Sequence, residues 1–121
     1  MAGNSTFRVA LVQMRSGRDP QANLASLSVS IDEAKGAGAD YVLTPEMTNI
    51  MENKRERLLA AIAPDENDPT LGALRSLARK HAIYIHVGSL AVKASADKAA
   101  NRSFLIDRRG DIVARYDKIH M

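Results

Sequence analysis

Short apolar runs recur along the chain, separated by longer and more polar segments. The runs that predict β-strands span 7–14, 40–44, 82–87, 102–107 and 111–116. They are rich in branched or aromatic residues, which favours strands over helices. The first run, 7–14, is apolar almost throughout, so we expect a strand covered on both faces. Small and polar residues at 94–100 predict a hairpin loop, and Arg108-Arg109-Gly110 predicts a tight turn between the last two strands.

Segments with helical character fill three of the intervals between these strands. Two of them open at Asp19-Pro20 and Asp68-Pro69, where Asp can cap the helix and Pro suits its first position. We expect the first of these helices to end near Gly36-Ala37-Gly38 and the other near Lys80. A further helix is predicted over 52–63. Helices that alternate with strands predict an α/β fold.

The composition narrows the class of protein. The chain has 121 residues, 45% of them hydrophobic, which suffices for the core of one domain. It has 17 basic and 14 acidic residues and only 4% aromatic ones, so we expect no nucleic-acid partner. Cysteine is absent, which excludes a disulfide framework. Neither a signal peptide nor an apolar run of membrane-spanning length is present, so we expect a cytoplasmic protein without a membrane partner.

Two charged residues follow predicted strands and are candidates for catalysis. Pro45 cannot donate a ladder hydrogen bond, so regular pairing of the second strand should stop there. Glu46 then lies just past the carboxyl end of that strand, where open α/β sheets bind ligands. It is placed to act as a general base, but position alone favours a solvated loop carboxylate. Lys118, after the last predicted strand, carries a weaker signal, because lysines near chain ends are mostly solvated.

The histidines and glycines predict no further site. The three histidines are scattered and lack the close spacing to a carboxylate that a metal site has. His86 shares a strand face with Tyr84, which favours a hydrogen-bonded core histidine. The glycines form neither a G-x-G-x-x-G nor a G-x-x-x-x-G-K run, so no nucleotide site is predicted. The residues by themselves therefore indicate an α/β protein and no metal.

Several segments, in the same order, resemble the nitrilase superfamily of carbon-nitrogen hydrolases. The segments that carry the resemblance are Leu11-Val12-Gln13-Met14, Asn23-Leu24, 39–47, Val87-Gly88-Ser89, 101–107 with Gly110, and 116–120. The most specific are the apolar strand that leads into Pro45-Glu46 and the segment Tyr116-x-Lys118-x-His120. The resemblance runs along nearly the whole chain. In detail it is greatest to the branch that includes deaminated glutathione amidase and ω-amidase.

This resemblance implies a fold, a mechanism and a substrate class. The fold is a four-layer α-β-β-α sandwich, and the mechanism is a Glu-Lys-Cys triad that hydrolyses non-peptide C–N bonds in small amides or nitriles. By match of motif, Glu46 would be the general base and Lys118 the cation beside the oxyanion. Neither a metal nor an organic cofactor is implied. The expected partners are a small-molecule amide substrate and, for full-length members, further copies of the same chain in a homo-oligomer.

The chain departs from the family pattern in one respect. The family's cysteine nucleophile follows the lysine segment, and this sequence contains no cysteine. We therefore expect residues 1–121 to be a single incomplete domain that lacks its carboxyl-terminal portion, exposes apolar sheet surface and is inactive alone. A non-catalytic interaction module on the same scaffold is the alternative, and a basic nucleic-acid-binding domain ranks last. A cysteine encoded downstream would favour the hydrolase over the module.

Overall fold

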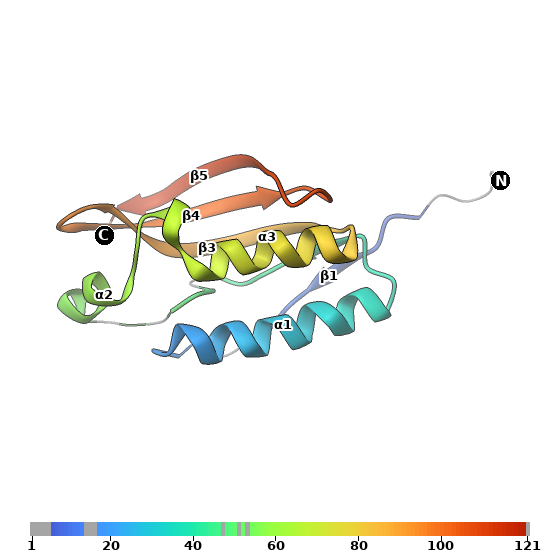
Figure 1. Cartoon of the computed structure of the whole chain (residues 1–121), viewed down its shortest axis with the longest axis horizontal. Coiled ribbons are helices and arrows are strands. Elements are labelled where there is room, and N and C mark those ends of the chain that lie inside the picture. Colours follow the sequence, from blue (N-terminus) through green and yellow to red (C-terminus); the bar gives the residue numbers. More distant parts are fainter. Residues whose placement is uncertain (1–5, 14–16, 47, 51, 53, 121) are drawn as a thin grey trace.

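The computed structural model describes residues 6–13, 17–46, 48–50, 52 and 54–120. They form a five-stranded sheet and a layer of helices (Figure 1). The elements in chain order are β1 (Val9–Leu11), α1 (Pro20–Gly36), β2 (Tyr41–Leu43), α2 (Arg55–Ala61), the 3-10 turn η1 (Asp65–Asn67), α3 (Pro69–His81), β3 (Tyr84–Ser95), β4 (Lys98–Ile106) and β5 (Ile112–His120). This alternation of strands and helices confirms the predicted α/β class.

The strands follow the order β1-β2-β3-β4-β5 across the sheet. β1, β2 and β3 are parallel, whereas β3, β4 and β5 pair as two antiparallel hairpins. Parallel neighbours need long crossover connections, and these run through the helices. Leu43, the last residue of β2, pairs with His86, and β3 continues to Ser95. The residues that follow β2 therefore have the backbone of β3 beside them.

The two Asp-Pro motifs start helices, as predicted. The Asp19 carboxylate accepts a hydrogen bond from the Gln21 N–H at 3.0 Å, and the Asp68 carboxylate accepts one from the Leu71 N–H at 2.8 Å. Each carboxylate satisfies a backbone donor that has no partner within the helix. α1 and α3 also end close to the predicted residues. The local signals were therefore sufficient to place both helices.

The hairpin predicted at 94–100 is present, but its loop is shorter than predicted. β3 and β4 both extend into this segment and leave only Ala96-Asp97 between them. Ala99 and Ala100, at the end of this segment, are buried. Ala99 belongs to a small apolar cluster with Leu58 of α2. The small side chains at the end of the segment thus belong to a packed strand and not to the loop.

β1, α2 and β5 also differ in length from their predictions. β1 is shorter than the strand predicted at 7–14. α2 is shorter than the helix predicted over 52–63, because Glu52 lies before the helix and accepts a hydrogen bond from the Lys54 N–H at 3.1 Å. β5 is longer than the strand predicted at 111–116, because its pairing with β4 continues past that range.

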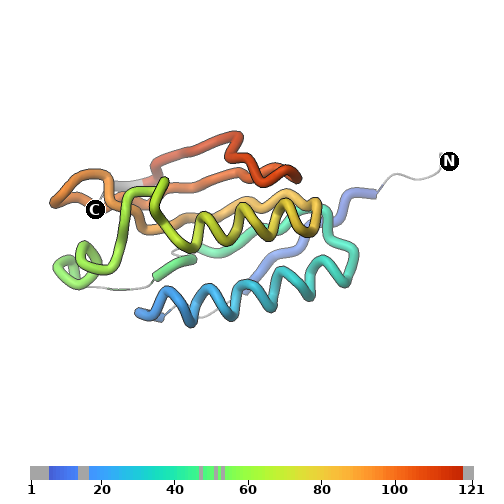
Figure 2. Tube along the Cα trace, viewed as in Figure 1, coloured from blue at the N-terminus to red at the C-terminus, as the bar shows by residue number. Residues whose placement is uncertain are grey.

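The two faces of the sheet differ in what lies on them. Helices α1 and α3 pack side by side on one face, here called the covered face (Figure 2). The core between them and the sheet includes Leu27, Ile31, Val42, Leu74, Ile85, Val87, Phe104 and Ile106. The other face, here called the open face, carries Val9, Leu11, Tyr41, Leu43, Tyr84, His86, Ser103, Leu105, Ala114 and Tyr116, which neighbour one another in the strand register.

The open face corrects the prediction for the first strand. We expected 7–14 to be covered on both faces, but Val9 is 56% exposed and Leu11 70% exposed. The intervening Ala10 packs against the core of the covered face. Met14, the last residue of that predicted strand, lies outside the described residues. An apolar run therefore marks a strand here, although helices cover only one of its faces.

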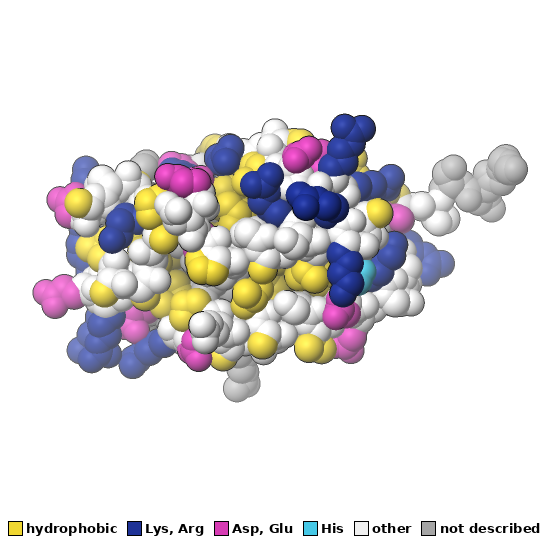
Figure 3. All heavy atoms as spheres, viewed as in Figure 1, with side chains coloured by type: hydrophobic (Ala, Val, Ile, Leu, Met, Phe, Trp, Pro, Cys, Tyr) yellow, Lys and Arg dark blue, Asp and Glu magenta, His cyan; other side chains and the backbone are white. Residues whose placement is uncertain are grey.

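Charged side chains are distributed over the surface without a single dominant patch in the view of Figure 3. Lys and Arg side chains lie at several separate places on this face, with Asp and Glu side chains among them. This distribution agrees with the small charge excess of the sequence. In the part of the chain that is described, no helix combines the length and the apolar character needed to cross a membrane.

Candidate functional site

Glu46 lies in the turn that follows β2, at the end of the sheet where the parallel strands have their carboxyl ends. The backbone of this turn stays close to β3. The Thr44 N–H donates to the His86 carbonyl at 2.9 Å, and the Ser89 N–H donates to the Pro45 carbonyl at 3.4 Å. Pro45 has no N–H to donate, so regular pairing ends where the sequence predicted. Glu46 is thereby held beside β3.

Gly88 of β3 permits this close approach. A Cβ atom at residue 88 would lie 2.4 Å from the Thr44 carbonyl oxygen and 2.7 Å from that of Pro45. Both are backbone atoms, so any side chain would force the turn away from the strand. The register with β4 also shifts here, because β3 advances by three residues from Val87 to Leu90 while β4 advances by two. Such a β-bulge bends a strand and re-aims its side chains.

Two buried threonines fix the turn from within. The Gly88 N–H donates to Thr44 Oγ1 at 3.2 Å, and Thr44 Oγ1 lies 2.9 Å from Thr48 Oγ1. The Thr48 hydroxyl donates to the Pro45 carbonyl, which leaves Thr44 to donate its own proton to Thr48. Both threonine side chains are buried and satisfied. A buried hydrogen-bond network of this kind rigidifies the segment that carries Glu46.

Lys118 lies at a second bulge, near the end of β5. Asn101 of β4 pairs with Ile119, and the next residue, Arg102, pairs with Asp117. Lys118 is thus an extra residue in β5 without an opposite partner in β4. Bulges, which interrupt regular pairing, are frequent beside active sites.

The structure brings Glu46 and Lys118 together. The Lys118 ammonium donates a hydrogen bond to Glu46 Oε1, although the two residues lie 72 positions apart in the chain. Both line a cavity of about 630 Å³ and remain accessible, with 62% of the Glu46 side chain and 36% of the Lys118 side chain exposed. The other lining residues are Leu43, Thr44, Pro45, His86, Gly88, Ser103 and Tyr116. The cavity therefore extends from the turn after β2 onto the open face.

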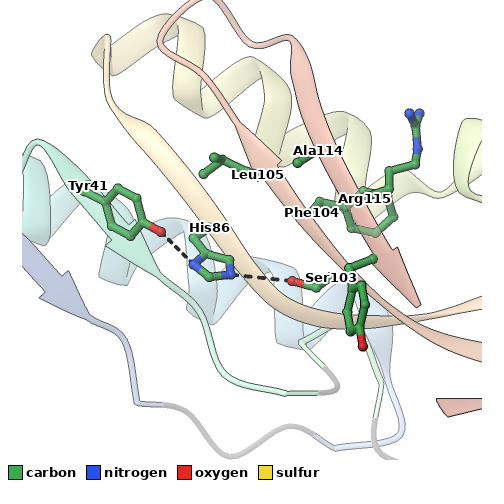
Figure 4. A pocket seen from close by; sticks show the side chains of 8 residues that line it. Tyr41, His86, Ser103, Phe104, Leu105, Ala114 and Arg115 are labelled. Carbon is green, nitrogen blue, oxygen red and sulfur yellow. Dashed lines mark hydrogen bonds between the residues drawn. The ribbon is translucent and has the colours of Figure 1, made fainter. Parts of the chain in front are cut away.

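His86 lines this cavity and also the neighbouring pocket drawn in Figure 4, where it lies between Tyr41 and Ser103. Its Nδ1 is 2.6 Å from the Tyr41 hydroxyl, and its Nε2 is 3.5 Å from Ser103 Oγ. Because Ser103 donates its proton to the Val87 carbonyl at 3.0 Å, it accepts from His86, and Tyr41 donates to Nδ1. This pattern assigns the neutral tautomer that carries its proton on Nε2. Burial, and then the charge of Lys118, lower the pKa of His86, which favours the same neutral form.

The sequence identified part of this arrangement. His86 is hydrogen-bonded, as predicted, but it is half-buried and lines the cavity instead of the core. Strand alternation with Tyr84 indicated which residues share its face. It could not indicate whether that face is packed under helices or open. The bulges at Gly88-Ser89 and Lys118 were not predicted, because each depends on the register between strands and not on the local residues.

The chemistry available to this pair is proton transfer beside a fixed positive charge. A carboxylate can take up and return a proton, and an ammonium group can stabilise a developing anion. A cysteine nucleophile is not part of this chain, because its sequence contains none. Among the residues that the structure describes, no group of three His, Cys, Asp or Glu side chains could hold a metal ion.

The comparisons with known sequences point to one family. The model of the carbon-nitrogen hydrolase family matches residues 8–121. A deaminated glutathione amidase of Yersinia enterocolitica is 35% identical over 116 residues, which cover 93% of this chain and 40% of that protein. The nitrilase and fragile histidine triad fusion protein NitFhit of Caenorhabditis elegans is 32% identical over 93% of this chain and 26% of that protein.

Solved structures have the same fold over the same partial span. The crystal structure of the C. elegans NitFhit protein superposes with a TM-score of 0.81 at 25% identity and covers 93% of this chain and 28% of that one. A variant of the amidase from Nesterenkonia sp. AN1, in complex with butyramide, superposes with a TM-score of 0.79 at 27% identity and covers 95% and 44%. Another structure of that amidase contains acrylamide added at the active-site cysteine. The predicted portion of a nitrilase-type α/β fold is confirmed, and the chain spans less than half the length of these relatives.

Proposed function

The chain belongs to the carbon-nitrogen hydrolase family, and on that premise we propose that it is the amino-terminal part of an amidase. The complete enzyme would hydrolyse small amides through Glu46, Lys118 and a cysteine supplied by sequence outside this chain. The observation that carries this proposal is the contact between the Lys118 ammonium and the Glu46 carboxylate in an accessible cavity. The position of Glu46 in the sequence did not by itself predict a contact with a lysine.

In the proposed reaction Glu46 takes the proton of the cysteine thiol, and the sulfur attacks the amide carbon. The carbonyl oxygen becomes an oxyanion, and Lys118 supplies positive charge beside it. When the C–N bond breaks, Glu46 returns the proton to the leaving ammonia or amine, and a thioester remains. Glu46 then removes a proton from water, which attacks the thioester carbon. The carboxylic acid is released, and the thiol recovers its proton.

The substrate proposed is a small amide of the kind that carries a carboxylate elsewhere in the molecule. The support is the likeness to relatives named deaminated glutathione amidase, at 35% identity in one case and 32% in another. Structures of the Nesterenkonia amidase with butyramide and with acrylamide support a small amide more generally. We further propose a cytoplasmic enzyme that assembles as a homo-oligomer when complete.

The test is amide hydrolysis by the product of the complete reading frame and by two variants. Glu46→Gln removes the base and Lys118→Met removes the cation, and each should lower kcat by at least about 100-fold. Glu56→Gln and Lys80→Met are matched controls, because these exposed residues lie on helices away from the cavity. Both controls should retain wild-type kcat.

Two outcomes would contradict the proposal. In one, Glu46→Gln and Lys118→Met keep the activity of their controls. In the other, the complete reading frame encodes no cysteine, and its product hydrolyses neither small amides nor nitriles. The absence of cysteine from these 121 residues makes a non-catalytic interaction module the second candidate function. The interaction module is supported only if the complete reading frame encodes no cysteine and its product hydrolyses neither amides nor nitriles.

A further inference from the structure

Arg102 of β4 is held by two carboxylates. Its guanidinium donates through Nε and Nη2 to both carboxylate oxygens of Asp117, the second at 3.1 Å. Its Nη1 donates to Asp65 Oδ2 at 3.0 Å. Only 20% of the Arg102 side chain is exposed. The hydrogen bond to Asp117, above all, raises the pKa of Arg102, so this group keeps its charge. A planar fork of five donors can hold two carboxylates in one geometry, which an ammonium cannot.

Arg102, Asp117 and Asp65, here called the clamp, lie next to the bulge that contains Lys118. Arg102 and Asp117 are cross-strand neighbours, and Lys118 is the next residue, where the register shifts. Successive strand residues point to opposite faces, so Asp117 points toward Arg102 while Lys118 points toward the cavity and Glu46. The two strands have lost regular pairing at this point. The orientation of Lys118 therefore depends on the hydrogen bonds that hold Asp117.

The third member of the clamp ties β5 to the helical layer. Asp65 belongs to η1, which packs against α3. Burial by itself would raise the pKa of the Asp65 carboxyl, but the hydrogen bond from Arg102 and the charges of Arg115 and Arg102 outweigh it and lower that pKa. The carboxylate is therefore ionised and available to Arg102 over the working range of pH. The end of β5 is thus fixed to both β4 and η1.

We propose that Arg102 is a positioning residue: by clamping Asp117 against Asp65, it holds the bulge of β5 so that Lys118 points at Glu46. The inference rests on the proposed function, because it assigns a role to Arg102 in the same site. Arg102 itself does not line the cavity that contains the pair. Its effect on catalysis is transmitted through the backbone of β5.

The chain offers a matched control in Arg115. Its Nε also donates to Asp65 Oδ2, at 3.2 Å, but it lies further from the bulge, and 51% of its side chain is exposed. Arg102→Met and Arg115→Met therefore each remove one arginine from the same carboxylate. Arg102→Lys keeps the charge but not the fork, and Asp117→Asn removes the charge of the clamped carboxylate. All four variants are to be made in the complete protein.

The expected kinetic result is a fall in kcat of about 10- to 100-fold for Arg102→Met and Asp117→Asn, with a small change in KM, because a displaced catalytic group costs rate more than binding. Arg102→Lys should lower kcat to a similar extent, and Arg115→Met should keep kcat within about twofold of wild type. The double variant Arg102→Met/Asp117→Asn should be no slower than either single one, because the two residues act as one unit. A fall in thermal stability with unchanged kcat for the folded fraction would overturn the proposal.

A second measurement keeps the two proposals separable. The ¹⁵N resonance of the Lys118 side chain, assigned with Lys118→Met, reports its contact with Glu46 whether or not the protein turns over an amide. Arg102→Met should shift this resonance toward its position in Glu46→Gln, and Arg115→Met should leave it unchanged. If the protein is active but Arg102→Met changes neither the resonance nor kcat, only the positioning role is contradicted. An inactive protein in which Arg102→Met shifts the resonance contradicts the amidase function alone.

Discussion

The covered and open faces of the sheet carry similar apolar residues in very different surroundings. On the covered face, Val42, Leu74 and Ile85 are completely buried between the sheet and helices α1 and α3. On the open face, Leu11 is 70% exposed and Tyr116 69% exposed. Apolar area removed from water is the main source of folding free energy, at about 25 cal/mol per Å². Stability is therefore concentrated on the covered face.

The candidate site belongs to the other face. His86, Ser103 and Tyr116 line the cavity that holds Glu46 and Lys118, and all three point to the open side of the sheet. The chain thus separates the residues that stabilise it from those for which we propose a role in catalysis. We propose that in the complete enzyme further layers cover the open face, in keeping with the four-layer sandwich that the family resemblance implies.

The largest effect is expected from a Leu→Ala substitution made once in the core of the covered face and once on the open face. Leu74→Ala on α3 should lower the free energy of unfolding by about 2–5 kcal/mol, because it leaves a cavity in the core. In the 121-residue chain, Leu11→Ala should change it by no more than about 0.5 kcal/mol. Denaturant unfolding of the chain and of the complete protein measures both. If layers cover the open face, the cost of Leu11→Ala should rise in the complete protein, and an unchanged cost there would contradict the proposed sandwich.

A smaller effect is expected when a glycine is replaced by alanine, once beside the site and once, for comparison, on helix α3. Gly88→Ala places a Cβ atom 2.4 Å from the Thr44 carbonyl oxygen, so it should cost about 1–3 kcal/mol and displace Glu46. Gly72→Ala meets nothing within 4 Å on α3 and should stabilise the protein by about 1 kcal/mol. Unfolding curves and kcat of the complete protein measure the two consequences. Equal effects of the two substitutions would show that the turn after β2 is not held close to β3.

The smallest effect concerns the pH dependence of stability. Burial and the charge of Lys118 lower the pKa of His86 below its ordinary value of 6.5. Between the lowered and the ordinary pKa the unfolded chain binds more protons, so stability should be constant above the ordinary value and fall as the pH drops through this window. His86→Asn should flatten this fall, which denaturant unfolding at a series of pH values below the ordinary pKa of histidine measures. Identical pH profiles for wild type and His86→Asn would contradict the assignment.

The sequence was sufficient for the features that local residues determine. Asp19-Pro20 and Asp68-Pro69 located two helix starts, because an N-cap and an N1 proline act within one turn. Pro45 marked the end of β2 pairing, since a missing N–H is a property of that residue alone. The prediction of Glu46 and Lys118 as site residues came from the family resemblance.

What the sequence missed depends on contacts between distant segments. Ala99 and Ala100 were included in the predicted loop, because nothing in the local sequence signals that Ala99 packs with Leu58 of α2 or that Ala100 belongs to the core of the covered face. The clamp of Arg102 on Asp117 joins cross-strand partners, and a strand's register is set by its partner. Exposed apolar sheet surface was expected from the family resemblance, but the first strand was predicted to be covered on both faces, because its residues do not indicate which face a helix covers.

The order in which the sheet can assemble follows from its connections. β3, β4 and β5 are joined by short turns, whereas β1 and β2 join the sheet only through long helical crossovers. Pairings between residues close in sequence form faster than those that close long loops. We therefore expect the strand that bears Lys118 to fold early and the turn that bears Glu46 to dock late. A partly folded chain then contains the lysine without its carboxylate, so that the pair of Glu46 and Lys118 is assembled only in the last stage of folding.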